Sequence, residues 1–401
     1  MIASTQPAAV SGKKDVLSTP DTAAIYLHIP FCEQRCSYCD FYTVAKREQA
    51  IPDYVDALLT EIDLQQASLF WQQQKYSTIF FGGGTPSLLS VAQVSRIVEA
   101  LRSAFFISEA AEVTMEANPG TVSRDQLAGY RQAGVNRLSL GVQSFHEDEL
   151  RQVDRIHSVS DIYKTVDATR AVGFANLSID LIFALPGQRP SRWRENLHQA
   201  VQLAPEHISA YNLTIEDGTP LYRLLASGKI RPLSEGRARA VYNFSIDFLA
   251  AHGYDQYEVS NYAKAGFHSH HNYKYWDGSC YLGLGASAHS FDGQRRFANV
   301  GNYVHYMKKL AEGWLPQDFE EWLTPEQKRF EMIFLGLRRS AGLNLAAYRA
   351  AFQADFYDEY EVQMEKMLHG EQPLLRLEDG HLRLTRDGLL LCDAVCAEFL
   401  A

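Results

Sequence analysis

The sequence predicts an α/β protein built on a parallel sheet, and three observations support this fold class. Apolar, β-rich segments recur through the first half of the chain, and longer segments with helical periodicity separate them. Gly, Asn, Gln or Pro stands at or near the end of each apolar segment. Strands that alternate with helices form βαβ units, whose strands run parallel. Six such units fit either a doubly wound sheet or an incomplete barrel, and periodicity alone does not choose between them.

The expected elements follow in order along the chain. Strands are predicted at 23–29, 78–81, 112–116, 137–141, 177–183 and 207–213, and helices at 52–74, 91–105, 124–133, 159–172 and 191–203. In both architectures ligands bind at the carboxyl ends of the strands. Polar and glycine residues gather at these ends, in segments 82–86, 116–119 and 141–144 and at Asp180 and Thr214. We therefore expect one cavity there.

The alternation stops near residue 250. A region rich in His, Tyr and Gly follows, and then a more helical stretch at 325–368. Asp379-Gly380 predicts a hairpin turn, and Thr385 is expected to cap a final helix that runs to Leu400. Helices with a hairpin resemble a winged-helix module. The expected division is a flexible tail at 1–20, a barrel at 21–250, the His/Tyr/Gly-rich region at 251–320 and a winged-helix-like domain at 321–401.

Composition excludes several classes of protein. The chain has 401 residues, of which 46% are hydrophobic and 21% charged, as in soluble globular proteins. A net charge of −10 disfavours a broad nucleic-acid-binding surface. Residues 321–401 are also acidic, so we expect a protein contact or a lid there and no DNA binding. No apolar stretch is long enough to span a membrane, and the first 20 residues lack the apolar core of a signal peptide, so the expected compartment is the cytoplasm.

Three of the six cysteines, Cys32, Cys36 and Cys39, fall within eight positions. In a reducing compartment such clustering indicates a metal centre or catalysis before a disulfide. Thiolates at this spacing suit an iron–sulfur or a zinc centre. Zinc would need a fourth ligand, and the nearest imidazole is His28. A cubane held by three cysteines would leave one iron open to an exogenous ligand, and buried structural cysteines are the remaining alternative.

Segment 26–39, YLHIPFCEQRCSYC, resembles the signature of radical S-adenosylmethionine (SAM) enzymes. The chain is similar to the branch of that family that contains the oxygen-independent coproporphyrinogen III dehydrogenase and the HemW-type haem chaperone. This similarity extends over the segments FFGGGTPS, EANPG, LSLGVQSF, SIDLIFALPG, EVSNYA, HNYKYW and YLGLGASAHS. The resemblance implies a partial (β/α)6 radical SAM barrel followed by a small α+β C-terminal region with a winged-helix-like end.

The resemblance also implies the cofactors and their ligands. Cys32, Cys36 and Cys39 would hold a [4Fe-4S] cluster whose open iron takes the amino and carboxylate groups of SAM. Contacts to SAM are implied for Tyr26, Tyr38, Gly83, Gly84, Thr85, Glu116, Gln143, Arg155, Asp180 and Thr214. Carboxylates suit the ribose hydroxyls and cationic groups of SAM, and a guanidinium suits its carboxylate. In such enzymes the reduced cluster cleaves SAM with one electron, which implies a reductant protein, such as a flavodoxin, as a partner.

Two features depart from the dehydrogenase. That enzyme has a further cysteine two positions after the third, where this chain has Phe41, and it has a longer N-terminal region. Both departures put porphyrinogen oxidation in doubt and leave cluster and SAM binding untouched.

The HNxxYW motif at 271–276 resembles that of the haem-binding branch and makes His271 a candidate haem ligand. His268, His270 and His289 are weaker candidates. The alternative is an aromatic packing patch with a hydrogen-bonded histidine.

The expected function is that of a haem chaperone, which binds a [4Fe-4S] cluster, SAM and haem and passes haem to an acceptor haem protein. The alternative is the oxidation of coproporphyrinogen III to protoporphyrinogen IX, and a zinc-stabilised interaction module is a remote third hypothesis. Cys392 and Cys396 lie on one apolar helical stripe and are expected in a core. Cys280 has no partner that the sequence identifies.

Overall fold

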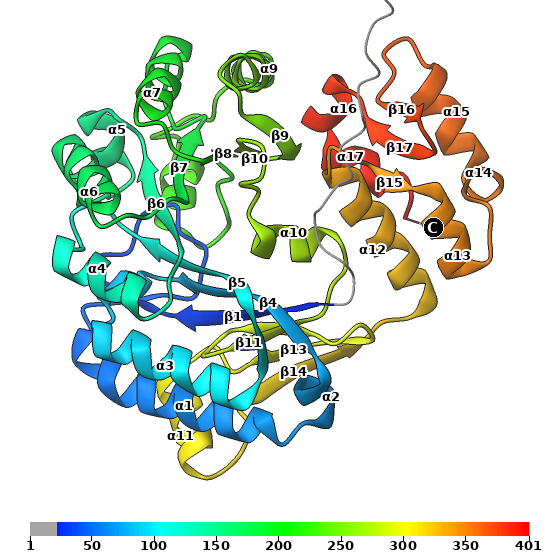
Figure 1. Ribbon diagram of the computed structural model, residues 1–401. Helices are drawn as coiled ribbons and strands as arrows, with labels where there is room; N and C mark the ends of the chain where they lie inside the picture. The colour runs from blue at the N-terminus through cyan, green and yellow to red at the C-terminus, as the bar shows by residue number, and fades with distance from the viewer. Residues whose placement is uncertain (1–21, 401) are drawn as a thin grey trace, which may run out of the picture.

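The computed structural model describes residues 22–400, so the tail predicted for 1–20 lies outside the described residues. A twelve-stranded mixed sheet forms the body of the protein (Figure 1). Its six central strands run parallel and curve into a partial barrel: β1 (Ala23–Ile29), β4 (Lys75–Gly83), β5 (Phe106–Ala117), β6 (Arg137–Gln143), β7 (Leu177–Phe183) and β8 (His207–Asn212). All six match predicted strands, and the α/β prediction is confirmed.

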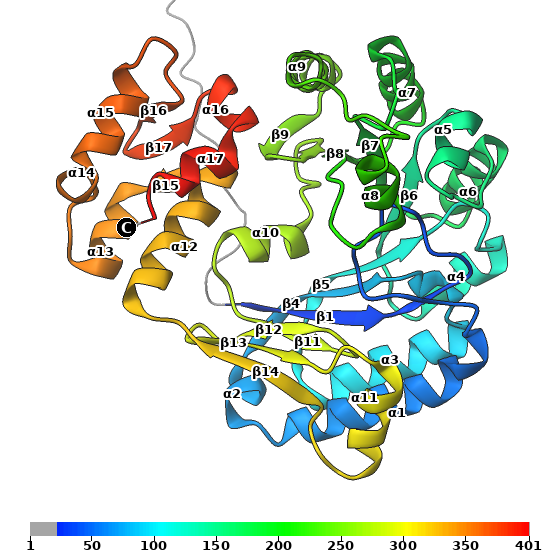
Figure 2. The ribbon, with the colours of Figure 1, turned by 180° about the vertical axis from the view of Figure 1, so that it is seen from behind.

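Helices cover the outer face of these strands (Figures 1 and 2). They are α1 (Ile51–Gln66), α3 (Val91–Ala104), α4 (Arg124–Gln132), α6 (Val159–Ala171) and α7 (Pro190–Gln202). Ser90, Ser123 and Ser158 begin three of them with a capping box. The single helix predicted at 52–74 is wrong: the backbone of Ser68 is extended, and a separate helix, α2 (Leu69–Gln73), follows it.

The inner face of the parallel strands is polar. Side chains alternate between the two faces of a strand. In β7, Ser178 and Asp180 lie on the inner face, whereas Ile179 and Leu181 lie on the outer face and join the main hydrophobic core. The barrel interior therefore offers hydrogen-bonding groups, where many barrels are filled with branched apolar side chains.

Residues 251–322 extend both edges of this sheet. On one side β11 (Tyr281–Leu284) pairs parallel with β1, followed by the antiparallel strands β12 (His289–Phe291), β13 (Arg295–Asn299) and β14 (Gln317–Trp322). On the other side β10 (Asn261–Ala263) pairs antiparallel with β8, and β9 (Asp255–Glu258) forms the edge. The short helix α10 (His270–Trp276) packs on β1 and β4.

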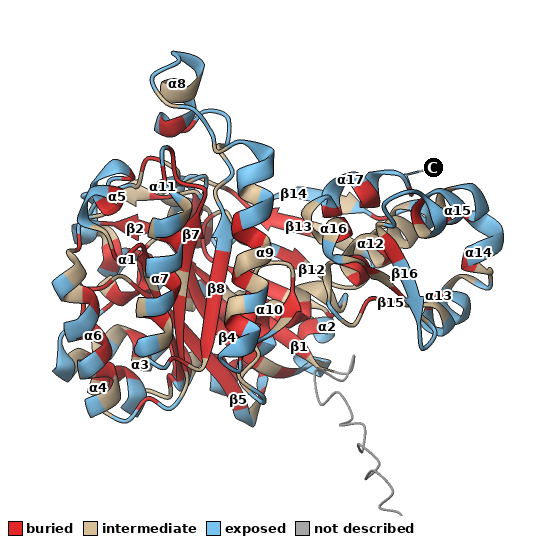
Figure 3. Cartoon of the chain, turned by 90° about the horizontal axis from the view of Figure 1, so that it is seen from above, coloured by how far each residue is buried: buried red, intermediate tan, exposed pale blue. Residues whose placement is uncertain are grey.

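The C-terminal region has its own hydrophobic core and projects to one side of the barrel (Figure 3). It contains α12 (Pro325–Arg338), α13 (Leu345–Phe352), α14 (Phe356–Glu359) and α15 (Glu361–His369), together with a three-stranded sheet of β15 (Leu343–Asn344), β16 (Leu375–Glu378) and β17 (His381–Leu384). Asp379 and Gly380 form the predicted hairpin turn, both with positive φ.

The end of the chain differs from the prediction in one respect. Thr385 caps a helix, as expected, but the helix is interrupted at Leu391, whose backbone leaves the helical region at φ −113°. Two helices result, α16 (Arg386–Leu390) and α17 (Cys392–Ala397). Cys392 and Cys396 lie in the C-terminal core, as predicted. Within residues 22–400 no helix is both long enough and apolar enough to cross a bilayer.

Candidate functional site

The carboxyl ends of the parallel strands surround a cavity of about 470 Å³, which we call the first cavity. The structure brings together here nearly all the residues expected at the site. They are Cys32, Cys36, Tyr38, Cys39, Gly83, Gly84, Thr85, Glu116, Gln143, Arg155, Asp180 and Thr214. These residues come from segments far apart in the sequence, and the strand order alone brings them to one edge of the sheet.

Cys32 ends β2 (Phe31–Cys32), and Cys36 and Cys39 lie on the loop between this strand and β3 (Val44–Ala45), a segment that we call the cysteine loop. Within the described residues, no group of three or more Cys, His, Asp or Glu side chains is placed to hold a metal ion. One zinc ion would need sulfur atoms about 4 Å apart, because Zn–S bonds measure about 2.3 Å. A cubane binds each thiolate through a different iron, so a loop of three spaced thiols on one cavity wall fits a cluster better than zinc.

Two neighbouring side chains reach these sulfur atoms. Thr85 Oγ1 donates to Cys32 Sγ at 3.6 Å, and Arg155 Nη1 donates to Cys36 Sγ at 3.4 Å. Burial raises the pKa of the Cys32 thiol to about 11. The free thiol is therefore protonated at neutral pH, and binding of a metal centre must release its proton.

Arg155 links the cysteine loop to the strand ends. Its Nη2 donates to Asn118 Oδ1 at 2.5 Å and to the carbonyl oxygen of Gly141 at 2.6 Å. Burial lowers the pKa of Arg155, but its interactions with Tyr38 and Cys36 outweigh this effect and raise it, so the guanidinium is charged. A fixed cation beside the cysteine loop and at the cavity wall suits the carboxylate of a bound amino acid.

Gly141 lies where three side chains converge. A Cβ built on Gly141 would lie 3.0 Å from Arg155 Nη2, 3.0 Å from Gln143 Nε2 and 3.2 Å from Asn118 Oδ1. Gln143 itself has a positive φ of 65°, and the register of β6 against β7 shifts at this point. Such backbone strain on a residue with a side chain is typical of functional sites, and here it turns the Gln143 side chain toward the cavity.

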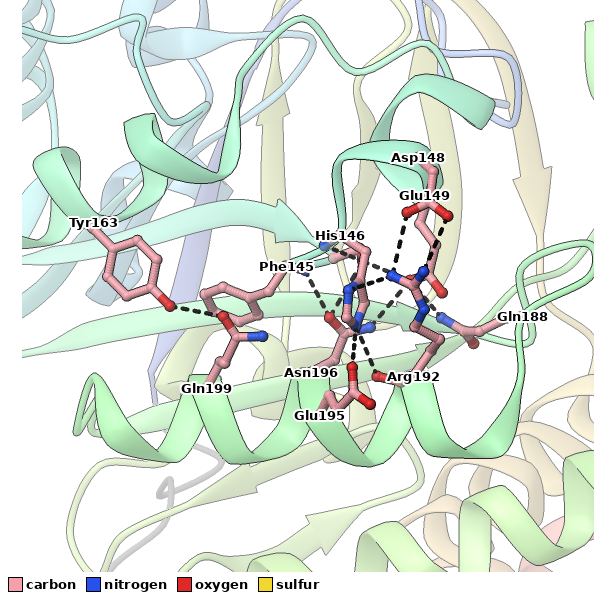
Figure 4. A network of polar contacts seen from close by, with 11 residues as sticks. Phe145, His146, Asp148, Glu149, Tyr163, Gln188, Arg192, Glu195, Asn196 and Gln199 are labelled. Carbon is pink, nitrogen blue, oxygen red and sulfur yellow. Dashed lines mark hydrogen bonds and ion pairs between the residues drawn. The ribbon is translucent and has the colours of Figure 1, made fainter.

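A polar network behind the cavity positions the segment between Gln143 and Arg155 (Figure 4). This segment contains α5 (Glu147–Gln152), a helix that the sequence analysis did not predict. Glu149 Oε2 accepts hydrogen bonds from Ser144 Oγ at 2.6 Å, Gln188 Nε2 at 3.0 Å and Asn196 Nδ2 at 3.2 Å. Since two of the donors lie outside the segment, Glu149 fixes α5 against α7 and the loop before it.

Two half-buried carboxyl groups face the first cavity. Asp180 accepts hydrogen bonds from Ser139 Oγ at 2.8 Å and from Ser209 Oγ at 2.6 Å. Glu116 Oε2 accepts one from the backbone N–H of Gly83 at 3.3 Å. Burial, and then the charge of Asp180, raises the pKa of Glu116 to about 8. A pair of carboxyl groups that face one cavity suits a ligand that carries positive charge and hydroxyl groups.

Close packing explains why positions 83 and 84 are glycines, a reason that the sequence analysis did not give. Gly83 has a φ of 108°, and a Cβ there would lie 2.6 Å from the His28 ring. A Cβ on Gly84 would lie 2.7 Å from the Phe31 carbonyl oxygen. The N–H groups of Gly84 and Thr85 donate to the backbone before the cysteine loop, both at 2.8 Å. These hydrogen bonds hold the glycine loop against the strand that leads into the cysteine loop.

A second cavity, of about 480 Å³, adjoins the first and shares Asp40, Phe41, Gly83 and Glu116 with it. Tyr26, expected beside the cluster, lies in this second cavity and not in the first. The walls of the second cavity are rich in aromatic and imidazole rings, namely those of Tyr26, His28, Phe41, Tyr42, Phe80, His271, Tyr275, Tyr281 and His289.

His271 lies on the wall of the second cavity and is almost fully buried. Its Nδ1 is 2.9 Å from Thr78 Oγ1, its Nε2 is 3.1 Å from Tyr275 Oη, and its ring stacks on Phe80 at 4.8 Å. Burial, and then the positive charges of Arg137 and Lys274, lowers the pKa of His271 to about 3, so the ring is neutral. His268 stacks on Tyr257 at 4.3 Å and does not line this cavity.

Among the residues that line the first cavity, sequence reasoning did not name Ser139 and Tyr211, and it placed Asn118 at a strand end without giving it a role. Asn118 joins Arg155 to Thr85, because its Nδ2 also donates to Thr85 Oγ1 at 3.1 Å. It stands directly after β5, so its position in the EANPG segment was the available signal. Ser139 and Tyr211 lie within strands, where only the direction of the side chain shows their role.

A partial barrel with a three-cysteine loop at its carboxyl edge defines a radical SAM protein. The family model of the Radical SAM superfamily matches residues 26–200, and that of the HemN C-terminal domain matches residues 323–391. Among solved structures, the radical SAM enzyme coproporphyrinogen III oxidase (HemN) from Escherichia coli is similar, with a TM-score of 0.81 and 26% identity. The match covers 95% of this chain and 91% of that one.

Curated relatives narrow the family. The chain is 35% identical to the Heme chaperone HemW of Bacillus subtilis over 376 residues, which are 94% of this chain and 98% of the relative. It is 34% identical to the Heme chaperone HemW of Lactococcus lactis, over 96% of this chain and 98% of the relative. The chain belongs to the HemW family of radical SAM proteins.

Proposed function

We propose that this chain is a haem chaperone that binds a [4Fe-4S] cluster and SAM in the first cavity, holds haem in the second, and passes haem to an acceptor haem protein. The observation that carries the proposal is the pair of adjoining cavities with different chemistry. One has thiols, carboxyl groups and a guanidinium, and the other has aromatic and imidazole rings. Relatives named as haem chaperones support this assignment over most of the chain.

In the first cavity, Cys32, Cys36 and Cys39 would ligate the cluster, which when bound supplies one-electron reduction of SAM. Arg155 would hold the carboxylate of SAM beside Cys36, and the carbonyl oxygens of the glycine loop would accept from its amino group. Glu116 and Asp180 would face the ribose hydroxyls and the positive charge. Tyr38, Gln143 and Thr214 would complete the walls, and a reductant protein such as a flavodoxin would deliver the electron.

In the second cavity, aromatic rings would pack against the porphyrin and exclude water. Tyr26 would lie near both SAM and haem, because Glu116 and Gly83, which we assign to the SAM site, line the same cavity as Tyr26. Phe41 lines both cavities and is 66% exposed, so its ring stands where a ligand would enter.

Haem binding and transfer test this proposal directly. The full-length protein, reconstituted anaerobically, is titrated with haem, and the complex is then mixed with apomyoglobin as a probe acceptor. We expect saturable binding of one haem per chain and transfer faster in the presence of SAM and a reductant than in their absence. Absence of saturable binding would refute the chaperone function.

The second candidate function is oxidation of coproporphyrinogen III, which the similarity to HemN over 95% of the chain favours. Phe41, at the position of the additional cysteine, argues against it. The test is anaerobic turnover with SAM, a reductant and coproporphyrinogen III beside an authentic dehydrogenase. We expect no protoporphyrinogen, and formation over many turnovers would establish the dehydrogenase activity.

A further inference from the structure

Three histidine rings line the second cavity, and they differ in whether a ring nitrogen is available. His28 Nδ1 is 3.0 Å from Tyr26 Oη, and its Nε2 is 2.9 Å from the carbonyl oxygen of Tyr42. Both nitrogens of His271 are likewise engaged, with Thr78 and Tyr275. A metal bond needs a nitrogen lone pair, so either ring would have to give up a buried hydrogen bond to bind iron.

His289 is different. Its side chain is exposed, it lines the second cavity, and within residues 22–400 its ring has no hydrogen-bond partner. Partial burial of the ring, and then the charge of Arg296, lowers the pKa of His289. The imidazole is therefore neutral at neutral pH, with a free lone pair. A neutral imidazole is the usual axial ligand of haem iron.

The backbone that carries His289 is held in place. His289 begins β12 and follows a tight turn that contains Gly285 at φ 100°. The buried carboxylate of Glu61, on α1, accepts from the N–H of Gly285 at 2.8 Å and from Asn299 Nδ2 at 2.6 Å. Asn299 N also donates to the Ala288 carbonyl oxygen at 2.9 Å. The ring therefore projects from a rigid support, as a ligand-binding residue requires.

The walls of the second cavity also offer flat rings. Tyr26 and Phe80 stack at 6.2 Å, and Phe80 also stacks on His271 at 4.8 Å. Aromatic faces of this kind pack against a planar macrocycle. Because these rings already stack on one another, they form a preformed surface for it.

We propose that His289 supplies the axial ligand to haem iron in the second cavity, and that His271 belongs to the wall against which the porphyrin packs. This inference deepens the proposed function and rests on it. On this assignment, the HNxxYW motif shapes the wall of the haem site, and a histidine outside the motif binds the iron.

Haem titration of the full-length protein and three variants tests the proposal. His289→Ala should shift the Soret band and weaken haem binding by about tenfold or more, which corresponds to about 1.4 kcal/mol. Added imidazole should restore the wild-type band in this variant, which a merely structural role of His289 would not allow. His271→Ala should keep the wild-type band position, and His305→Ala, which changes an exposed histidine on α11 (Tyr303–Ala311), should behave as wild type.

The outcomes distinguish failure of the proposed function from failure of the assignment to His289. If wild-type protein does not bind haem, the proposed function fails, and this inference fails with it. If wild type binds haem and His289→Ala shows the same band and affinity, only the assignment to His289 is overturned. Loss of the wild-type Soret band in His271→Ala, with rescue by imidazole, would show that His271 binds the iron and would overturn the assignment to His289.

Discussion

Glu116 and Asp180 face one cavity from β5 and β7, and burial together with the charge of Asp180 raises the pKa of Glu116 to about 8. The barrel thus holds a carboxyl group that is mostly neutral at pH 7 and becomes charged when a cation arrives. SAM carries such a cation. Its binding would therefore be linked to release of a proton from Glu116.

The first prediction concerns this linkage. The affinity for SAM should rise with pH up to about 8, by up to about tenfold per pH unit, because only the ionised Glu116 attracts the sulfonium group. Calorimetry in two buffers with different ionisation enthalpies measures the released proton. Glu116→Gln should bind SAM more weakly above pH 8 and with a flatter pH profile. An unchanged slope in this variant would assign the titration to another group.

The second prediction concerns the cysteines. Wild-type protein reconstituted anaerobically should contain about four iron and four sulfide per chain. Alanine at Cys32, Cys36 or Cys39 should abolish this content, whereas Cys280→Ala, which changes a half-buried cysteine outside the loop, should retain it. Iron and acid-labile sulfide analysis gives the answer, and stoichiometric zinc in its place would restore the zinc hypothesis.

The third prediction concerns Arg155. Arg155→Ala should reduce SAM affinity by about 1.5–3 kcal/mol, because a charge-assisted contact to the carboxylate is lost. It should also alter the absorption spectrum of the cluster, since Arg155 contacts Cys36. Arg151→Ala, on the exposed side of α5, is the matched control. Unaltered SAM affinity would remove Arg155 from the binding site.

The fourth prediction concerns Glu61, whose carboxylate also accepts from Tyr306 Oη at 2.6 Å. Glu61→Ala should lower the free energy of unfolding by about 2–4 kcal/mol, because three buried donors lose their acceptor. Asp63→Ala, an exposed acid on the same helix, should change it by less than about 0.5 kcal/mol. Chemical denaturation measures both, and equal stability of the two variants would show that the Glu61 network carries little energy.

The fold was largely predictable because the six central strands are rich in apolar residues, are separated by helices and have Gly, Asn, Gln or Pro at or near their ends. The sequence did not reveal α5, whose six residues, EDELRQ, show no apolar periodicity and whose position depends on Glu149 contacts from α7. It did not reveal strands β9–β14 either. They are short and gain stability from the sheet edges that they extend.

The members of the site were more predictable than their arrangement. Residues at strand ends converge because parallel strands end on one side of a sheet. The position of Tyr26 on the wall of the second cavity has no local signal, because residues of α10, far away in the sequence, form much of that wall and α10 packs over β1 and β4. The same holds for His271, whose ring nitrogens are engaged by Thr78, far away in the sequence, and by Tyr275.

The pairing of β1 with β11 has a consequence for biogenesis. Residues 24–27 pair with residues 281–284, so one edge of the strand that leads into the cysteine loop has no partner until most of the chain has left the ribosome. An open strand edge invites association with other chains, and contacts of such long sequence separation form slowly. Completion of the strand therefore comes late in synthesis, and insertion of an iron–sulfur cluster before that point would meet a loop whose supporting strand still lacks a neighbour.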